Sequence, residues 1–314
     1  MPSMRSIKRR KESVTSTQQI TKAMKLVATV KLQKARQKVE ANAPYFEALY
    51  KTICSILAKT LDLDNRFLNE NAGGKKVVIA MSSNRGLAGG YNSNLVKKID
   101  SYGFDKENTL IYGLGRKGIE GLRRRGYQVE WDESDIINEP LYNDCIAITK
   151  DLMTRFDAGE ISEIYVAYTD FQNTVTHVPT VRKLLPLSRA DFEDDLEETL
   201  GESKDDRNLQ MSYGMSGSGI EKDMVIFGAV MDHYHPEQKI LNEIIPKYIT
   251  NIIYGAFLEA IASENAARMQ AMDSATENAQ DMISSLELQY NRARQGSITQ
   301  ELTEIIAGSQ ALNG

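Results

Sequence analysis

"MQAMDSATENAQDMISSLELQYNRA", residues 269–293, carries an apolar or small side chain at every third or fourth position. The members of this stripe are Met269, Met272, Thr276, Ala279, Ile283, Leu286, Tyr290 and Ala293. Spacings that alternate between three and four residues are the heptad pattern of a coiled-coil seam, along which a second helix packs. Between Pro246 and Ala307 there is no other proline and only two glycines, Gly255 and Gly296. The pattern predicts one helix of roughly 90 Å at 1.5 Å per residue.

The N-terminal segment predicts a second long helix. Residues 3–43 contain neither Pro nor Gly and consist mostly of helix-forming residues. Pro44 is expected to interrupt the helix, after which residues 45–61 resume a helical pattern. Two helices of this length could not bury their apolar stripes on the domain of about 180 residues between them. We therefore expect the two terminal helices to pair with each other as an antiparallel coiled coil, and Ala262 and Ala266 would allow a close approach.

The middle of the chain changes its hydrophobic period and predicts an α/β domain. Apolar runs typical of strands begin near residues 75, 108, 127, 163, 181 and 224, with short amphipathic helices between several of them. This alternation favours a largely parallel sheet. The domain boundaries that follow are residues 1–61 for the N-terminal coiled-coil helix, 75–236 for the α/β domain and 239–310 for the C-terminal coiled-coil helix. Residues 190–222 read as a flexible acidic insertion within the α/β domain.

Composition and charge limit the class of protein. With 314 residues, 41% hydrophobic and 26% charged, the chain resembles an ordinary soluble protein, and no apolar run approaches the roughly 20 residues that span a bilayer. Residues 1–40 carry eleven Lys or Arg residues against Glu12 and Glu40, a balance of +9 on a chain whose net charge is −5. A basic segment on an acidic protein predicts an anionic partner. Cys54 and Cys145 are expected to be reduced structural thiols of a cytoplasmic protein.

Three short motifs suggest ligand chemistry, and each is better explained as structure. "GLGRKG", residues 113–118, fits the dinucleotide fingerprint, but it does not follow the first predicted strand, so we interpret it as a turn and helix start. "SSNRGLAGGYN", residues 82–92, is glycine-rich but lacks the Lys-Ser/Thr ending of a phosphate loop, so we interpret it as a structural loop. Asp232, His233 and His235 have no third ligand signalled nearby, which favours a surface loop over a metal site.

The basic N-terminal helix could contact nucleic acid or protein. Ile20, Met24, Val27 and Val30 interrupt its charges at helical spacing, so one face is apolar, and aromatic residues that could stack on bases are absent before Tyr45. Both features favour a protein partner over a nucleic acid.

Both ends of the chain resemble a known family. The segment "IKRRKESVTSTQQITKAMKLVATVKLQKAR" (residues 7–36), the loop "SSNRGLAGGYN" and the segment "ENAARMQAMDSATENAQDMISSLELQYNRARQGSITQELTEIIAGSQAL" (residues 264–312) are similar to gamma subunits of bacterial F-type ATP synthases. The resemblance implies long terminal helices in an antiparallel coiled coil with a central Rossmann-like α/β domain. It further implies that the chain is a rotor shaft which couples ion-driven rotation of a membrane c ring to ATP synthesis, and the reverse.

The same resemblance implies partners and contact residues. The partners are three alpha and three beta subunits, the epsilon subunit and the c ring, at the cytoplasmic face of the bacterial membrane and peripheral to it. The chain itself would hold no catalytic residue, cofactor or metal, because nucleotide is bound by the alpha and beta subunits. Matched by motif, the subunit-coupling contacts are Met24, Lys25, Glu264, Arg268, Arg294, Gln295 and Thr299.

Three departures and two alternatives accompany the resemblance. Ala88 stands where the family often has Cys, which argues against a redox role for that loop. The stretch "VMDHYHPEQ" (residues 230–238) replaces a more usual acidic, proline-containing stretch, and the acidic stretch 191–206 is longer than usual; both leave the epsilon and c-ring contacts open. A generic coiled-coil scaffold would have larger apolar residues on its seam. A nucleotide-dependent oxidoreductase would need the loop at Gly113 to bind a ligand.

Overall fold

The computed structural model describes residues 4–59, 66–68, 73–138, 140–187 and 236–313. They form two compact units, each of which is described by itself. One unit consists of the residues up to Leu32, those from Asn265 onward, and the loop residues Leu87–Gly89. The other consists of Gln33–Gly86 and Gly90–Glu264. Two long helices, α1 (Met4–Lys59) and α7 (Pro236–Asn313), contribute to both units.

The larger unit is built on a five-stranded sheet in the order β3-β2-β1-β4-β5. Its strands are β1 (Lys75–Met81), β2 (Thr109–Leu114), β3 (Gln128–Asp132), β4 (Ile161–Phe171) and β5 (His177–Leu185). The first four are parallel to one another, and β5 pairs antiparallel with β4. Five of the six predicted strands, and the largely parallel sheet, are thereby confirmed. The sixth, near residue 224, lies outside the described residues, as do the acidic insertion 190–222 and Asp232, His233 and His235.

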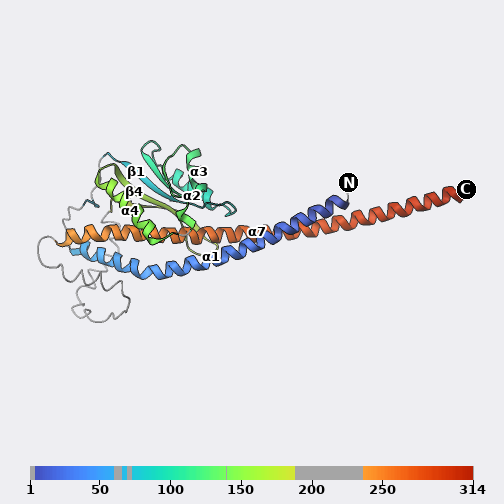
Figure 1. Cartoon of the computed structure of the whole chain (residues 1–314), viewed down its shortest axis with the longest axis horizontal. Coiled ribbons are helices and arrows are strands. Elements are labelled where there is room, and N and C mark those ends of the chain that lie inside the picture. The colour runs from blue at the N-terminus through green and yellow to red at the C-terminus, as the bar shows by residue number, and fades with distance from the viewer. Residues whose placement is uncertain (1–3, 60–65, 69–72, 139, 188–235, 314) are drawn as a thin grey trace, which may run out of the picture. The chain divides into compact units, whose positions relative to one another are not determined.

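Helices cover both faces of this sheet (Figure 1). The helices between the strands are α2 (Tyr91–Ser101), α3 (Arg116–Arg124), the 3-10 turn η1 (Ile136–Asn138) and α4 (Tyr142–Asp157). Val78 and Ala80 of β1 pack among residues of α2 and α3, whereas Val77, Ile79 and Met81 pack with α4, α7 and Ile53 of α1. Because both faces are buried, the central strand reads as a continuous apolar run rather than an alternating one.

Pro44 does not interrupt the first helix, so that expectation is wrong. α1 continues through Pro44 to Lys59, and α7 likewise contains Pro246 and begins ten residues earlier, at Pro236. A proline inside a helix removes one backbone hydrogen bond and crowds the preceding turn. Packing just after Pro44 compensates, because the rings of Phe46 and Tyr50 lie 5.7 and 6.3 Å from that of the buried Tyr248. Tertiary contact therefore outweighs the local preference.

The smaller unit pairs the start of α1 with the second half of α7, running antiparallel (Figure 1). The predicted α7 stripe is confirmed, since every member is buried or half-buried. On α1 the corresponding positions are Ile7, Lys11, Val14, Gln18, Thr21, Lys25, Ala28 and Leu32, all buried or half-buried. They too alternate at spacings of four and three residues, but three of the eight are Lys or Gln. The coiled-coil fold is thus as predicted, with an unexpectedly polar seam on the α1 side.

Candidate functional site in the paired helices

Four polar pairs bridge α1 and α7 along the seam. Lys11 donates a hydrogen bond to Glu287, and Gln18 Nε2 donates to Gln280 Oε1 at 2.8 Å. The hydroxyls of Thr21 and Thr276 are hydrogen-bonded at 2.7 Å, and Lys25 Nζ donates to Asp273 Oδ1 at 2.5 Å. As the α1 number rises from 11 to 25, the α7 number falls from 287 to 273, so one antiparallel register accounts for all four pairs.

Sequence reasoning missed this α1 seam because it sought apolar residues. The signal that could have found it is the complementarity of polar residues between the two helices. When the α7 sequence is aligned in reverse with that of α1, each Lys of the α1 seam lies opposite an acidic residue, and Gln18 lies opposite Gln280. Polar residues at core positions of a coiled coil specify its register at some cost in stability. The two ion pairs are half-exposed, with the side chains of Lys25 and Asp273 at 40% and 49% of full exposure, so each contributes only about 0–1 kcal/mol.

The predicted coupling residues are spread along both helices. Met24 and Lys25 are half-buried in the seam of α1, and Glu264 and Arg268 are half-buried on α7. Arg294, Gln295 and Thr299 are exposed on the last part of α7, which extends beyond the described start of α1 (Figure 1). Lys25 is already paired with Asp273, which a partner contact through this residue would have to share or replace. The roles of all seven residues stay predictions.

Two groups of apolar side chains on the paired helices are exposed in the chain by itself. On α1 they are Ile20, Leu26, Val27 and Val30, of which Ile20, Val27 and Val30 belong to the apolar face noted from the sequence. On the last part of α7 they are Ile298, Leu302, Ile305 and Ile306, between 48% and 67% exposed. α7 does not cover the first group, because the α1 seam lies at other positions of the heptad. Exposed apolar stripes of this kind mark surfaces that bind another protein.

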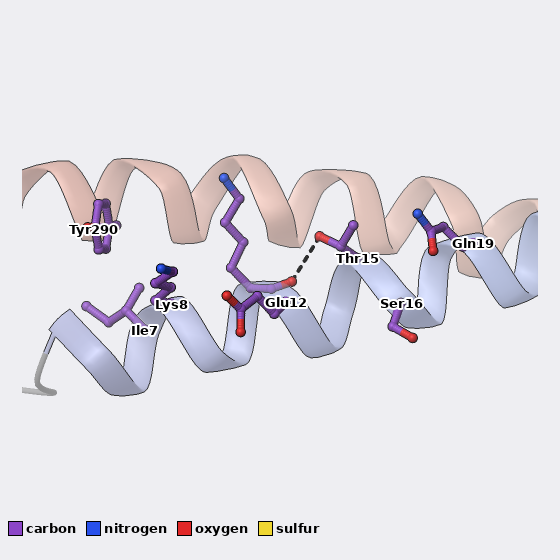
Figure 2. Close-up of a pocket in the computed structure, with 8 residues that line it drawn as sticks. Ile7, Lys8, Glu12, Thr15, Ser16, Gln19 and Tyr290 are labelled. Carbon is purple, nitrogen blue, oxygen red and sulfur yellow. Dashed lines mark hydrogen bonds between the residues drawn. The ribbon is translucent and has the colours of Figure 1, made fainter.

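A groove of about 440 Å³ runs along the beginning of α1. Figure 2 shows its lining, which is Ile7, Lys8, Lys11, Glu12, Thr15, Ser16 and Gln19 of α1 with Tyr290 of α7. The Thr15 hydroxyl donates to the Lys11 carbonyl oxygen at 3.0 Å, which is a bond within the helix. Charges of both signs and several hydroxyls share the lining, so the groove carries no single chemical preference.

The "GLGRKG" turn binds its own chain where a dinucleotide site would bind phosphate. The backbone N–H of Arg116 donates to Asn84 Oδ1 at 3.1 Å, that of Lys117 to the Ser83 carbonyl at 3.0 Å and that of Gly118 to Ser82 Oγ at 2.9 Å. These are the first amides of α3, the groups that hold a pyrophosphate in a dinucleotide-binding fold. Because the loop after β1 occupies them, the geometry agrees with the interpretation as a turn and helix start.

The loop after β1 is fixed in turn by its own polar side chains. Asn92 Oδ1 accepts from the Ser83 backbone N–H at 2.9 Å, and Asn84 Nδ2 donates to the Ser134 carbonyl at 2.6 Å. The glycines of "GLGRKG" serve close packing: a Cβ on Gly115, for example, would lie 2.1 Å from the Ser82 carbonyl oxygen. Among the described residues no group of three potential metal ligands is found.

The cysteines are buried in the larger unit and form no disulfide. Burial, with a smaller contribution from Asp144, raises the pKa of the Cys145 thiol to about 12. The thiolate is therefore scarce near neutral pH, as expected for a structural thiol. In the part of the chain that the structure describes, no helix has the length and apolar character needed to cross a membrane.

Comparison with known proteins agrees with this architecture over the full length. A family model described as ATP synthase matches residues 3–312. The ATP synthase gamma chain of Lachnoclostridium phytofermentans is 52% identical, covering 100% of both chains. The chain belongs to the ATP synthase gamma-chain family. A relative from Acetobacterium woodii, named as a sodium ion specific gamma chain, is 38% identical over 99% of both chains.

Chains from solved structures of ATP synthase rotors and central stalks share this fold at low sequence identity. A chain of the rotor of the Euglena gracilis mitochondrial ATP synthase matches with a TM-score of 0.60 at 16% identity, covering 94% of this chain and 98% of that one. A chain of the central stalk and c ring of the Tetrahymena thermophila enzyme matches with a TM-score of 0.51 at 20% identity. The predicted family and fold class are confirmed.

The packing of Ser82 against α3 makes a first prediction. A Cβ on Gly118 would lie 2.4 Å from Ser82 Oγ and 2.5 Å from Ser82 Cβ, so Gly118→Ala should destabilise the α/β domain by about 1–3 kcal/mol. Urea unfolding followed by fluorescence measures this, since Trp131, the chain's only tryptophan, lies in β3. Gly86→Ala is the control, because a Cβ there meets nothing within 4 Å. Equal stability of the two variants would contradict the packing argument.

The polar seam makes a second prediction. Lys25→Glu places like charges opposite each other at Asp273 and should destabilise the smaller unit by about 1 kcal/mol or less, while adding Asp273→Lys should restore most of the loss. Hydrogen exchange of the amides of residues 14–32, measured by mass spectrometry, reports the opening of the paired helices. Lys22→Glu, an exposed charge reversal on the same helix, is the matched control. Failure of the double variant to recover would mean that the pair does not contribute to the seam.

Proposed function

We propose that the chain is the central rotor shaft of an F-type ATP synthase and carries rotation between a membrane c ring and the beta-subunit catalytic sites. The observation that carries the proposal is the end of α7, which extends past α1 as a single helix with Ile298, Leu302, Ile305 and Ile306 exposed. A lone helix with an apolar stripe needs an apolar sleeve around it. Membership in the gamma-chain family identifies the surrounding assembly as the ATP synthase.

The proposed assembly contains three alpha and three beta subunits around the paired helices, with the epsilon subunit and the c ring at the α/β domain. The chain itself is non-catalytic, and nucleotide is bound by the surrounding subunits. The helix start at "GLGRKG" supports this assignment, because its amides are already bonded within the chain. The complex lies at the cytoplasmic face of the membrane, and this chain is peripheral to the bilayer.

Coupling follows from the asymmetry of the paired helices. A shaft presents a different face to each of three chemically identical partners, so each partner's conformational equilibrium is biased differently. Such a bias requires contacts that differ in free energy between the faces. Basic side chains on α1, Lys25 among them, together with the apolar Met24, supply those contacts toward acidic loops of the beta subunits, while Arg294, Gln295 and Thr299 hold the tip. Glu264 and Arg268 act on coupling from α7. Exposed ion pairs of about 0–1 kcal/mol suit contacts that break at every step.

Native mass spectrometry tests the proposal. The complex is purified through an affinity tag on the beta subunit, so that both ends of this chain stay native. One copy of the chain per three alpha and three beta subunits supports the proposed role. An alpha–beta hexamer without the chain, or a homodimer of the free chain, would overturn it.

A double variant near the end of α7 is predicted to weaken binding to the hexamer. Ile305→Asp with Ile306→Asp should leave the free chain as stable as before, because both side chains are already more than half exposed. In the complex the two charges would be forced into an apolar sleeve, so we expect at least a tenfold weaker association with the hexamer. Gln300→Asp with Thr303→Asp adds the same charge at other exposed positions of the tip. If the isoleucine variant bound the hexamer as tightly as the unchanged chain does, the apolar stripe at the end of α7 would not contact the surrounding subunits.

A further inference from the structure

Inside the larger unit, α7 packs closely against the carboxyl end of β4. Ser263 Oγ donates a hydrogen bond to the Thr169 carbonyl at 2.9 Å, and the Tyr91 hydroxyl of α2 donates to the Ala260 carbonyl at 3.2 Å. Leu258 and Ala260 are at most 1% exposed. The helix backbone around residue 259 is therefore fixed against the sheet.

Two carboxyl groups meet in this contact. The side chain of Glu259 on α7 lies within hydrogen-bonding reach of the side chain of Asp170 on β4, and its Oε2 atom is buried without a hydrogen-bond partner. Tyr168 and Asp170 are alternate residues of β4 and so share a face of the sheet. Arg182, opposite Val166 on β5, lies on the same face and is itself exposed. In the described part of the chain these are the ionisable groups that act on Glu259.

A hydrogen bond between two carboxyl groups requires a proton on one of them, because an ionised carboxylate can only accept. Burial acts in the same direction, since it disfavours the charged form. Burial first, and Asp170 second, raise the pKa of Glu259 to about 7, against a smaller opposing effect of Arg182. The burial of Glu259 and its nearness to Asp170 thus both favour the protonated form of Glu259.

We propose that Glu259 and Asp170 bind one proton between them and thereby form a pH-dependent clasp between α7 and the sheet. With the proton in place, the two side chains are joined by a hydrogen bond. Without it, two adjacent carboxylates repel each other inside a contact that is otherwise tightly packed. The proposal concerns the larger unit alone and does not depend on the function proposed above.

The sign of the effect follows from linkage. The pKa of Glu259 in the folded chain, about 7, is above its ordinary value of 4.5. The stabilisation is therefore fully present below about pH 4.5 and is lost as the pH rises, with the loss complete once the pH passes through about 7. Between these values the unfolded chain releases the proton and the folded chain retains it.

Carbon-13 NMR of the full chain, labelled selectively at the glutamate carboxyl carbon, tests the site directly. We expect one resonance to titrate with a midpoint at least one pH unit above the others, and Glu259→Gln to remove it. Asp170→Asn should move that midpoint down, because the neighbouring negative charge is gone and the Asn amide can donate to the carboxylate. Glu243→Gln, at an exposed position of the same helix, should leave the displaced resonance in place.

Hydrogen exchange distinguishes a clasp from a merely buried acid. After correction for the intrinsic effect of pH, exchange at the Thr169–Val178 end of the β4–β5 pair should accelerate between about pH 5 and 7 in the native chain. It should do so less in Glu259→Gln, while β1–β2 serves as the internal reference. Ordinary titration of every glutamate, survival of the displaced resonance in Glu259→Gln, or no change of midpoint in Asp170→Asn would each overturn the proposal.

Discussion

The pairing of α1 with α7 is the constraint on which the rest of the architecture depends. A helix of 78 residues cannot bury a continuous stripe on an α/β domain that is much shorter than the helix itself. Only another helix can follow such a stripe over its whole length, and in this chain the N-terminal helix does so. Ala266, Ala279 and Ala28 are nearly fully buried, so small side chains alternate with larger ones such as Ile283 and Leu286 in the packing of the paired helices.

The sheet obeys a different constraint, which is that both of its faces are covered. Val78 and Ala80 meet α2 and α3, while Val77, Ile79 and Met81 meet α4 and α7. The second set ties α7 into the core of the larger unit, so the helix that forms the seam is also a structural member of the domain. Glu259 belongs to this second role, since it lies where the apolar face of β4 gives way to Tyr168 and Asp170.

Much of this could be predicted from the sequence, and the parts that could not have identifiable physical reasons. The α7 stripe and the five described strands were readable because apolar residues recur at a period that one secondary structure satisfies. The α1 seam was not, because Lys11, Gln18 and Lys25 are stabilised there by partners more than 240 positions away. The expected helix break at Pro44 was wrong for a related reason. Proline does destabilise the helix locally, but the packing of Phe46 on Tyr248 outweighs this effect. The "GLGRKG" turn shows that the function of a glycine-rich motif depends on which groups bind its backbone amides. Here these groups include the side chains of Ser82 and Asn84.

The distribution of polar and apolar residues on α1 differs from that in a free-standing coiled coil, and the difference supports the proposed assembly. Lys and Gln occupy seam positions, while Ile20, Leu26, Val27 and Val30 face outward. In an isolated protein this arrangement would be doubly unfavourable, because it weakens the pairing and exposes apolar surface to water. It becomes favourable when a surrounding sleeve covers the outward face, since the polar pairs then need only fix the register. Under the proposed function, the surrounding subunits would therefore add to the stability of the paired helices.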